Sequence, residues 1–402
     1  MFASPSVNTI AVCPDFFQNS DLSLLPILGA EHPDLKEVEL RGPGLRYDET
    51  THGHIRSFLS NLNQDKPQLE TVLLPNVDEK ILEYLSCLPS LKCLVIDELC
   101  GFDSFFGSFG SEKRFLRLEN LSLWSTTPEV ALGILGTGDR AAFTEVAFTF
   151  KKSYPTSETT RRLYDAIVAR CSMSTLRSLT VNDEFMYSKS TDMLNDEDCD
   201  NYVVSPTTLH TLFRFTNLTT IVLKPYFGFD LNDTVVSELA RAWIQVESLS
   251  VGFSYDCHST FATQATLVGL QAIATHCSRL ENLDFCFNAK RVPPLETTNA
   301  QTMLHTFDVR CSPISSPKVV AKFLSTLFPN LTSLSYGCTA DESNPVDACW
   351  KEVRRLLCWP PSQLEGTMSD GLAMSDWEGS SADGEFTGDW TEDEVDDTTG
   401  SE

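Results

Sequence analysis

The sequence of 402 residues lacks the motifs by which most nucleotide-binding and hydrolytic enzymes are recognised. It has no G-x-x-x-x-G-K-S/T loop, no H-E-x-x-H, no G-x-S-x-G, and no G-x-G-x-x-G after a strand pattern. The close pair His52 and His54 in THGH has no third metal ligand nearby, so this segment is interpreted as a polar loop. These absences predict a protein that is not an enzyme, with no catalytic residue, no cofactor and no metal.

Long apolar runs and paired cysteine motifs are also missing. The first twelve residues lack the basic start of a signal peptide, and no apolar run approaches membrane-spanning length, so we expect no membrane interaction. The 13 cysteines are scattered without a C-x-x-C pair. This pattern indicates reduced thiols in a cytoplasmic or nuclear protein, not a disulfide framework.

Positive charge is scarce, with 30 Lys and Arg against 56 Asp and Glu and a net charge of −26. No basic stripe is present and phosphate would repel so acidic a chain, so we expect no nucleic-acid partner. Residues 365–402 hold 13 acidic and no basic residues, which predicts a disordered acidic tail over 361–402. A second acidic stretch, 184–200, is predicted to be a loop inserted between repeats.

One pattern, apolar-x-x-apolar-x-apolar, recurs eleven times. The copies are PDLKEVEL (33–40), PQLETVLL (67–74), PSLKCLVI (89–96), LRLENLSL (116–123), AAFTEVAF (141–148), STLRSLTV (174–181), TNLTTIVL (216–223), QVESLSV (245–251), SRLENLDFCFN (278–288), MLHTFDV (303–309) and PNLTSLSY (329–336). Their first apolar positions run from Leu35 to Leu331, so the mean interval is about 30 residues.

A repeat of this length and pattern is typical of a leucine-rich-repeat solenoid. Each short strand carries too few apolar side chains for a core of its own, so the strands must stack in parallel. Helical apolar spacing recurs between the strands, at 78–88, 159–171, 233–244, 266–277 and 317–328. The sequence therefore predicts an α/β horseshoe with concave parallel strands and convex helices. We expect an N-terminal cap (1–30), a solenoid of about eleven repeats (31–360) and the tail (361–402).

The positions that could carry function are the third, fifth and seventh of each motif, which alternate with buried positions and line the concave face. Trp124 is the candidate anchor, because exposed aromatic residues often dominate interfaces. The alternative is that its indole folds back against Leu99 or a neighbouring loop. The predicted binding face, for an unknown protein partner with basic or neutral contact surfaces, comprises Asp97, Asn120, Ser122, Trp124, Glu145, Asp284, Asp308 and Arg310.

The same alternation makes a prediction about stability on one strand. Leu283 is predicted to point inward, so Leu283→Ala should cost about 2–5 kcal/mol. Asp284 is predicted to point outward as a solvated charge, so Asp284→Ala should cost less than about 0.5 kcal/mol.

A family resemblance rests on FDVRCSPISSPKVVAKFLSTLFPNLTSLSYG (307–337), followed by CWKEVRRLL (349–357). These segments resemble the C-terminal end of the leucine-rich-repeat region in F-box proteins expanded in mushroom-forming fungi. The resemblance covers about residues 20–358 and is specific between Ser312 and Leu331. It implies that the repeats hold substrates of a cullin ubiquitin ligase, whose Skp adaptor binds an N-terminal F-box. No F-box pattern precedes Leu35, so Skp and cullin are expected partners only if an F-box exists upstream.

Two alternatives remain open. A Ran-type GTPase-activating protein similarly joins leucine-rich repeats to an acidic tail, but its repeats usually carry Asn after the leucine core, and here only Asn288 occupies that position. The other alternative is a plain leucine-rich-repeat scaffold without ligase or GTPase partners.

Overall fold

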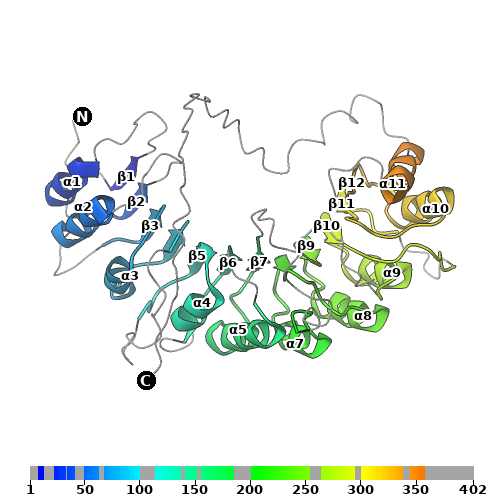
Figure 1. The fold of residues 1–402 in the computed structure, drawn as a ribbon, viewed down its shortest axis with the longest axis horizontal. Helices are drawn as coiled ribbons and strands as arrows, with labels where there is room; N and C mark the ends of the chain where they lie inside the picture. Colours follow the sequence, from blue (N-terminus) through cyan, green and yellow to red (C-terminus); the bar gives the residue numbers. More distant parts are fainter. Residues whose placement is uncertain are drawn as a thin grey trace, which may run out of the picture. The chain divides into compact units, whose positions relative to one another are not determined.

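A computed structural model describes residues 8–12, 22–32, 34–40, 49–62, 68–99, 114–136, 141–151, 155–184, 201–253, 264–294, 300–337 and 345–357, all within the unit Met1–Trp359. They form one twelve-stranded sheet whose spatial order follows the chain from β1 to β12 (Figure 1). All of its strand pairs are parallel. The predicted acidic tail and residues 185–200 lie outside the described residues.

The strands are β1 (Thr9–Val12), β2 (Glu37–Leu40), β3 (Thr71–Leu74), β4 (Cys93–Ile96), β5 (Asn120–Thr126), β6 (Glu145–Phe150), β7 (Ser178–Asp183), β8 (Thr220–Lys224), β9 (Ser248–Val251), β10 (Asn282–Phe285), β11 (Thr306–Asp308) and β12 (Ser333–Ser335). The helices are α1 (Leu25–Glu31), α2 (Glu49–Asn61), α3 (Glu79–Ser86), α4 (Pro128–Leu135), α5 (Ser157–Arg170), α7 (Pro206–His210), α8 (Asp233–Ala242), α9 (Leu267–His276), α10 (Pro317–Leu327) and α11 (Pro345–Leu356), with 3-10 turns η2 (Leu22–Leu24) and η5 (Thr211–Arg214).

The predicted leucine-rich-repeat solenoid is confirmed. One strand, β2 to β12, begins within each of the eleven repeat motifs, and the five helical patterns correspond to α3, α5, α8, α9 and α10. The additional strand β1 was not predicted and pairs with β2. The helices lie on one side of the sheet (Figure 1).

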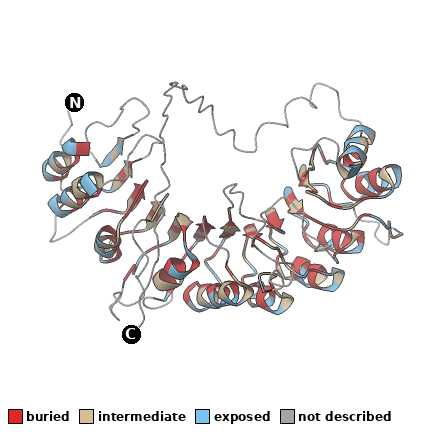
Figure 2. Ribbon diagram, viewed as in Figure 1, coloured by how far each residue is buried: buried red, intermediate tan, exposed pale blue. Residues whose placement is uncertain are grey.

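The core is a set of ladders that run between the sheet and the helices. The register places Val38 beside Val72, Val72 beside Leu94 and Leu94 beside Leu121, and all four side chains are buried. Figure 2 shows the buried residues on the strands and on the helix faces that look toward them. This continuous burial supplies the stability that a single repeat lacks.

Side-chain caps fix where several helices begin. Asp78 accepts a hydrogen bond from Ile81 N at 2.8 Å at the start of α3, and Asn232 accepts one from Val235 N at 3.1 Å at the start of α8. Such caps are each worth about 1 kcal/mol.

At the C-terminal end of the repeats, Trp350 of α11 is buried and its Nε1–H donates to Ser312 O at 2.7 Å. Helix α11 therefore closes that end of the core.

Two interpretations of the sequence are wrong. His52 and His54 lie in helix α2, not in a loop, and buried His52 Nε2 is 3.0 Å from Asn76 Oδ1. Cys311 is disulfide-bonded, although all thiols were expected to be reduced. Asn76 is 24 residues from His52 in the sequence and is brought near by the fold, so sequence spacing gives no sign of this contact.

Within the described ranges, no group of three or more His, Cys, Asp and Glu side chains is placed to hold a metal ion. The helices among these residues include none with the length and apolar character needed to cross a membrane.

Candidate functional site

The helices leave one face of the sheet uncovered, which we call the open face; it corresponds to the predicted concave face (Figure 1). The register aligns its outward residues into two rows that cross all twelve strands. The first row, at the start of the strands, is Thr9, Glu37, Thr71, Cys93, Asn120, Glu145, Ser178, Thr220, Ser248, Asn282, Thr306 and Ser333. The second row lies two residues further along each strand, and we call it the middle row. Its members are Ala11, Glu39, Leu73, Val95, Ser122, Ala147, Thr180, Val222, Ser250, Asp284, Asp308 and Ser335.

The eight predicted site residues lie in two groups on this face. The tryptophan group consists of Asn120, Ser122 and Trp124 on β5, Glu145 on β6 and Asp97 just after β4. The charge cluster contains Asp284 on β10, Asp308 on β11 and Arg310, which follows β11. Strands β5 and β10 are five steps apart in the sheet, which corresponds to about 24 Å at the usual strand spacing. The residues therefore form two sites rather than one.

Trp124 presents its indole on the open face. The side chain is 47% exposed, and its Nε1–H donates to Ser122 Oγ at 2.8 Å on the same strand. The hydrogen bond holds the ring along β5 while leaving about half of its surface accessible. Of the two arrangements considered from the sequence, the structure shows the exposed one.

A β-bulge accompanies this presentation. Leu123 pairs with Phe148, but the next pair joins Thr126 to Phe150, so β5 has one residue more than β6 over this interval. The extra length coincides with Ser125, whose φ of 50° is in the left-handed region. A side chain there carries a cost of order 1–3 kcal/mol, and bulges of this kind re-aim neighbouring side chains. Sequence reasoning missed the bulge, because no glycine marks it.

Other polar groups of the tryptophan group lie on β5 and on the neighbouring strands. Asn120 Oδ1 accepts a hydrogen bond from Thr144 Oγ1 at 2.6 Å, while Glu145 and Asp97 are exposed. Burial raises the pKa of the Cys93 thiol, and the Glu145 and Glu37 carboxylates raise it further. The anchor thus has a polar rim with acidic character, as is common around interface hot spots.

The charge cluster is built on Asp284. Its carboxylate accepts hydrogen bonds from Arg310 Nε and Nη2 at 2.9 and 2.6 Å and from Ser250 Oγ at 2.8 Å. Lys224 Nζ lies 2.7 Å from the same group. Asp308 is secondary, because Arg310 Nε is 3.5 Å from its carboxylate while the Arg310 backbone N–H donates to it at 2.9 Å. Two positive and two negative groups therefore neutralise one another.

The two carboxyl groups respond differently to this setting. Burial acts to raise the pKa of Asp284, but Arg310 and Lys224 outweigh it and lower that pKa to about 2. Burial raises the pKa of Asp308, which Arg310 offsets only in part. Asp284 therefore stabilises the fold above about pH 4, and this contribution is lost as the pH falls toward 2.

We now expect Asp284→Ala to lower the free energy of unfolding by about 1–2 kcal/mol, because it removes the shared acceptor of Arg310 and Lys224. The smaller effect predicted from the sequence assumed a solvated charge, whereas the Asp284 side chain is only 20% exposed. Urea midpoints measure the difference. Asn282→Ala on the same strand is the control, and equal midpoints for the two variants would contradict this account.

Lys224 and Ser250 belong to the cluster but were not among the predicted site residues. Alternation identifies both as outward positions. Their contact with Asp284 depends on the register of β8, β9 and β10, which are joined by connections of different length. The sequence did offer one signal for the Lys224–Asp284 contact, which is the opposite charge of outward residues on nearby strands. Opposite charge does not by itself show which residues form a pair.

Comparisons with known proteins give a fold likeness only. No protein-family model and no curated protein matches the chain. Among solved structures, it is similar to one described as a yeast complex of Rad7 and Elc1, with 14% identity, a TM-score of 0.39, and coverage of 83% of this chain and 78% of that one. It is also similar to the leucine-rich repeat-containing protein LegL7 from Legionella pneumophila, with 12% identity, a TM-score of 0.30, and coverage of 89% and 92%. Values this low do not indicate what this chain binds.

Proposed function

We propose that this chain is a non-catalytic protein-binding module that holds its partner on the open face, with Trp124 as the anchor. The observation that carries this proposal is the indole, 47% exposed at a fixed position on β5. Because the sheet already fixes the backbone and Ser122 restrains the ring, binding costs little conformational entropy. Tryptophan is also among the residues that contribute most to measured interfaces.

The surface beside the indole suits a protein partner. From β3 to β9 the middle row carries no charge and consists of apolar and small polar side chains: Leu73, Val95, Ser122, Ala147, Thr180, Val222 and Ser250. A partner can cover this strip without desolvating an ionised group. Asn120, Glu145 and Asp97 supply polar contacts at its margin. An uncharged centre with a polar margin is the usual composition of a protein interface.

The test is the loss of binding when the anchor is truncated. Trp124→Ala is expected to weaken the complex with a captured partner by about 2 kcal/mol, or about 30-fold, in calorimetric titrations. Val268→Ala is the matched control, because this side chain is 46% exposed on helix α9. A partner whose affinity survives Trp124→Ala, or falls equally with the control, would show that the open face is not the binding surface.

A narrower role is substrate binding for a cullin ubiquitin ligase. It is supported by the resemblance of residues 307–337 to the repeats of fungal F-box proteins. Under this proposal the open face holds the substrate, and Skp binds only through an F-box encoded upstream. Mass spectrometry of material captured with the chain, extended by its upstream genomic sequence, should detect Skp and cullin. Their absence would reject the ligase role and leave the proposed protein-binding function standing without it.

A further inference from the structure

We propose that the partner is an extended basic polypeptide segment that crosses β2 to β6, with basic side chains opposite Glu37 and Glu145 and an apolar side chain against Trp124. The inference rests on the proposed function and specifies the chemistry of the partner.

The charge of the open face is one-sided over its first seven strands. The charged side chains that strands β1 to β7 direct to this face are Glu37, Glu39 and Glu145, and these strands contain no Lys or Arg. Among the residues of these strands, a partner on the open face therefore meets negative charge only. Complementary charge on the partner favours encounter and disfavours wrong partners.

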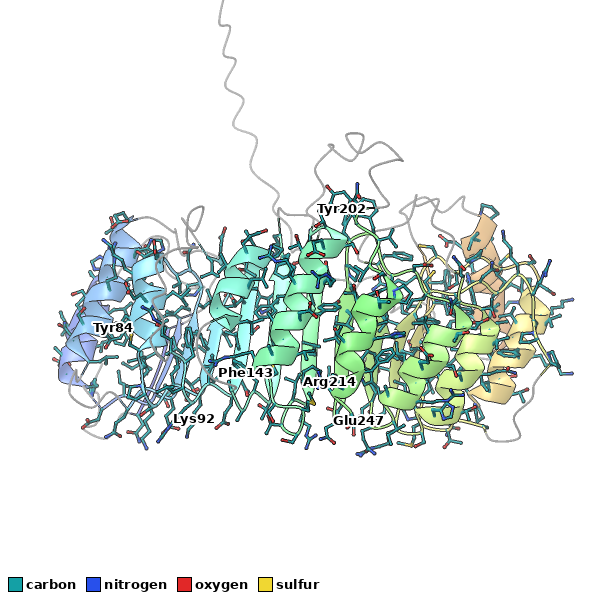
Figure 3. All side chains as sticks on the ribbon, turned by 90° about the horizontal axis from the view of Figure 1, so that it is seen from below. Tyr84, Lys92, Phe143, Tyr202, Arg214 and Glu247 are labelled. Atoms are coloured by element: carbon teal, nitrogen blue, oxygen red, sulfur yellow. The ribbon has the colours of Figure 1, made fainter. Side chains whose placement is uncertain are left out.

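Two nearby basic groups, Lys92 and Lys151, lie outside the strands and have carboxylate partners. Lys92 precedes β4 and lies at the edge where the strands begin, together with Glu247 before β9 (Figure 3). Its Nζ is 2.6 Å from a carboxylate oxygen of Glu70. Lys151 follows β6, and its Nζ is 3.4 Å from Glu184. Neither cation lies among the strand residues of the open face.

Glu37 and Glu145 act on the same part of the surface. Both belong to the first row, where Cys93 on β4 lies midway between them. Burial is the largest cause of the raised pKa of the Cys93 thiol, and the two carboxylates raise this pKa further. The hydrogen bond that Glu37 accepts from Thr9 Oγ1, at 3.0 Å, comes from a neutral group and leaves its charge in place. A cation above β4 would therefore be attracted by both carboxylates.

Spacing determines the form of the segment. Four strand steps separate Glu37 on β2 from Glu145 on β6, or about 19 Å. An extended chain rises about 3.3 Å per residue, so basic residues about six positions apart can reach both carboxylates. Between them the middle row offers Leu73, Val95 and Ser122, over which the segment can lie. Trp124 lies two positions beyond Ser122 on β5, about 7 Å from the middle row, and receives an apolar side chain from a segment that lies over that row.

The experiment is a selection from a phage-displayed library of random 12-residue peptides on the immobilised full chain. A soluble synthetic peptide of residues 365–402 is added as competitor, because its 13 acidic residues would otherwise collect basic peptides. Enriched peptides are expected to carry Lys or Arg about six positions apart with an apolar residue between them. Enrichment of acidic or uncharged peptides, or no enrichment, overturns the inference.

The best peptide is then synthesised and titrated by fluorescence anisotropy. The double variant Glu37→Gln, Glu145→Gln is expected to bind it about tenfold more weakly, which corresponds to about 1.4 kcal/mol. Glu129→Gln, at an exposed position on helix α4, should leave the affinity unchanged. A basic peptide unaffected by the double variant overturns the inference.

Trp124→Ala separates the two proposals. Loss of affinity for an acidic or uncharged peptide in this variant leaves the proposed function standing while the basic partner is rejected. Unchanged affinity for every enriched peptide rejects the open face itself and the inference with it.

Discussion

Leu283→Ala is expected to lower the free energy of unfolding by about 2–5 kcal/mol, because it leaves a cavity between stacked repeats. Leu283 is 2% exposed and points from β10 toward the helices. The register places it beside Leu249 on β9 and Phe307 on β11. Since each repeat is stabilised mainly by its neighbours, a cavity here weakens the contacts on both sides.

Asn282→Ala is the control for this substitution, because Asn282 is exposed and points outward from the same strand. Its urea midpoint should stay close to that of the wild type, with an effect within about 0.5 kcal/mol. Similar midpoints for Leu283→Ala and Asn282→Ala would mean that the inward and outward faces of β10 have been assigned the wrong way round.

The strands could be predicted because the apolar pattern that defines them is also what buries them. In LRLENLSL, Leu118, Leu121 and Leu123 recur at the motif positions, and all three are buried. Strand β1 was missed although Val7, Ile10 and Val12 have the spacing of the motif; none of the three is a leucine. Helix α2 was missed because THGH is polar, although the structure buries His52 against Asn76.

The candidate site was predictable only to the level of which side chains face outward. Alternation placed Trp124 and Asp284 on the open face, but it could not determine their contacts. Lys224 and Asp284 are 60 residues apart in sequence and meet through the register of three strands. The bulge at Ser125 depends on a backbone conformation that serine does not favour, so residue preference argues against it.

Asp183 is a buried acid at the end of β7 that no sequence pattern indicated. It is 4% exposed and occupies an inward position of the strand. Its Oδ2 accepts a hydrogen bond from the backbone N–H of Tyr226, at 2.8 Å, just after β8. Nearby on the helix side, Tyr164 of α5 is fully buried, and no atom of the described residues forms a hydrogen bond with its hydroxyl. The Asp183 carboxylate helps to raise the pKa of Tyr164, after burial, well above its ordinary value.

Burial raises the pKa of Asp183 to about 7, and the Tyr226 N–H opposes this only in part. The ordinary value of 3.8 applies in the unfolded chain, so between about pH 4 and pH 7 the folded state holds the proton more tightly. The contribution of Asp183 to stability is therefore largest below about pH 4. It decreases as the pH rises toward 7 and stays low above that.

Asp183→Asn should abolish this dependence, because the amide is neutral at every pH and its oxygen can still accept the Tyr226 N–H. The difference in free energy of unfolding between the variant and the wild type should therefore grow in favour of the variant by about 2–3 kcal/mol as the pH is raised from 5 to 8. Urea denaturation at several pH values measures the difference. Asp34→Asn, at an exposed position, should run parallel to the wild type. A fixed offset of Asp183→Asn at all pH values would mean that Asp183 is already ionised at pH 5. The Tyr226 hydrogen bond would then outweigh burial at this site.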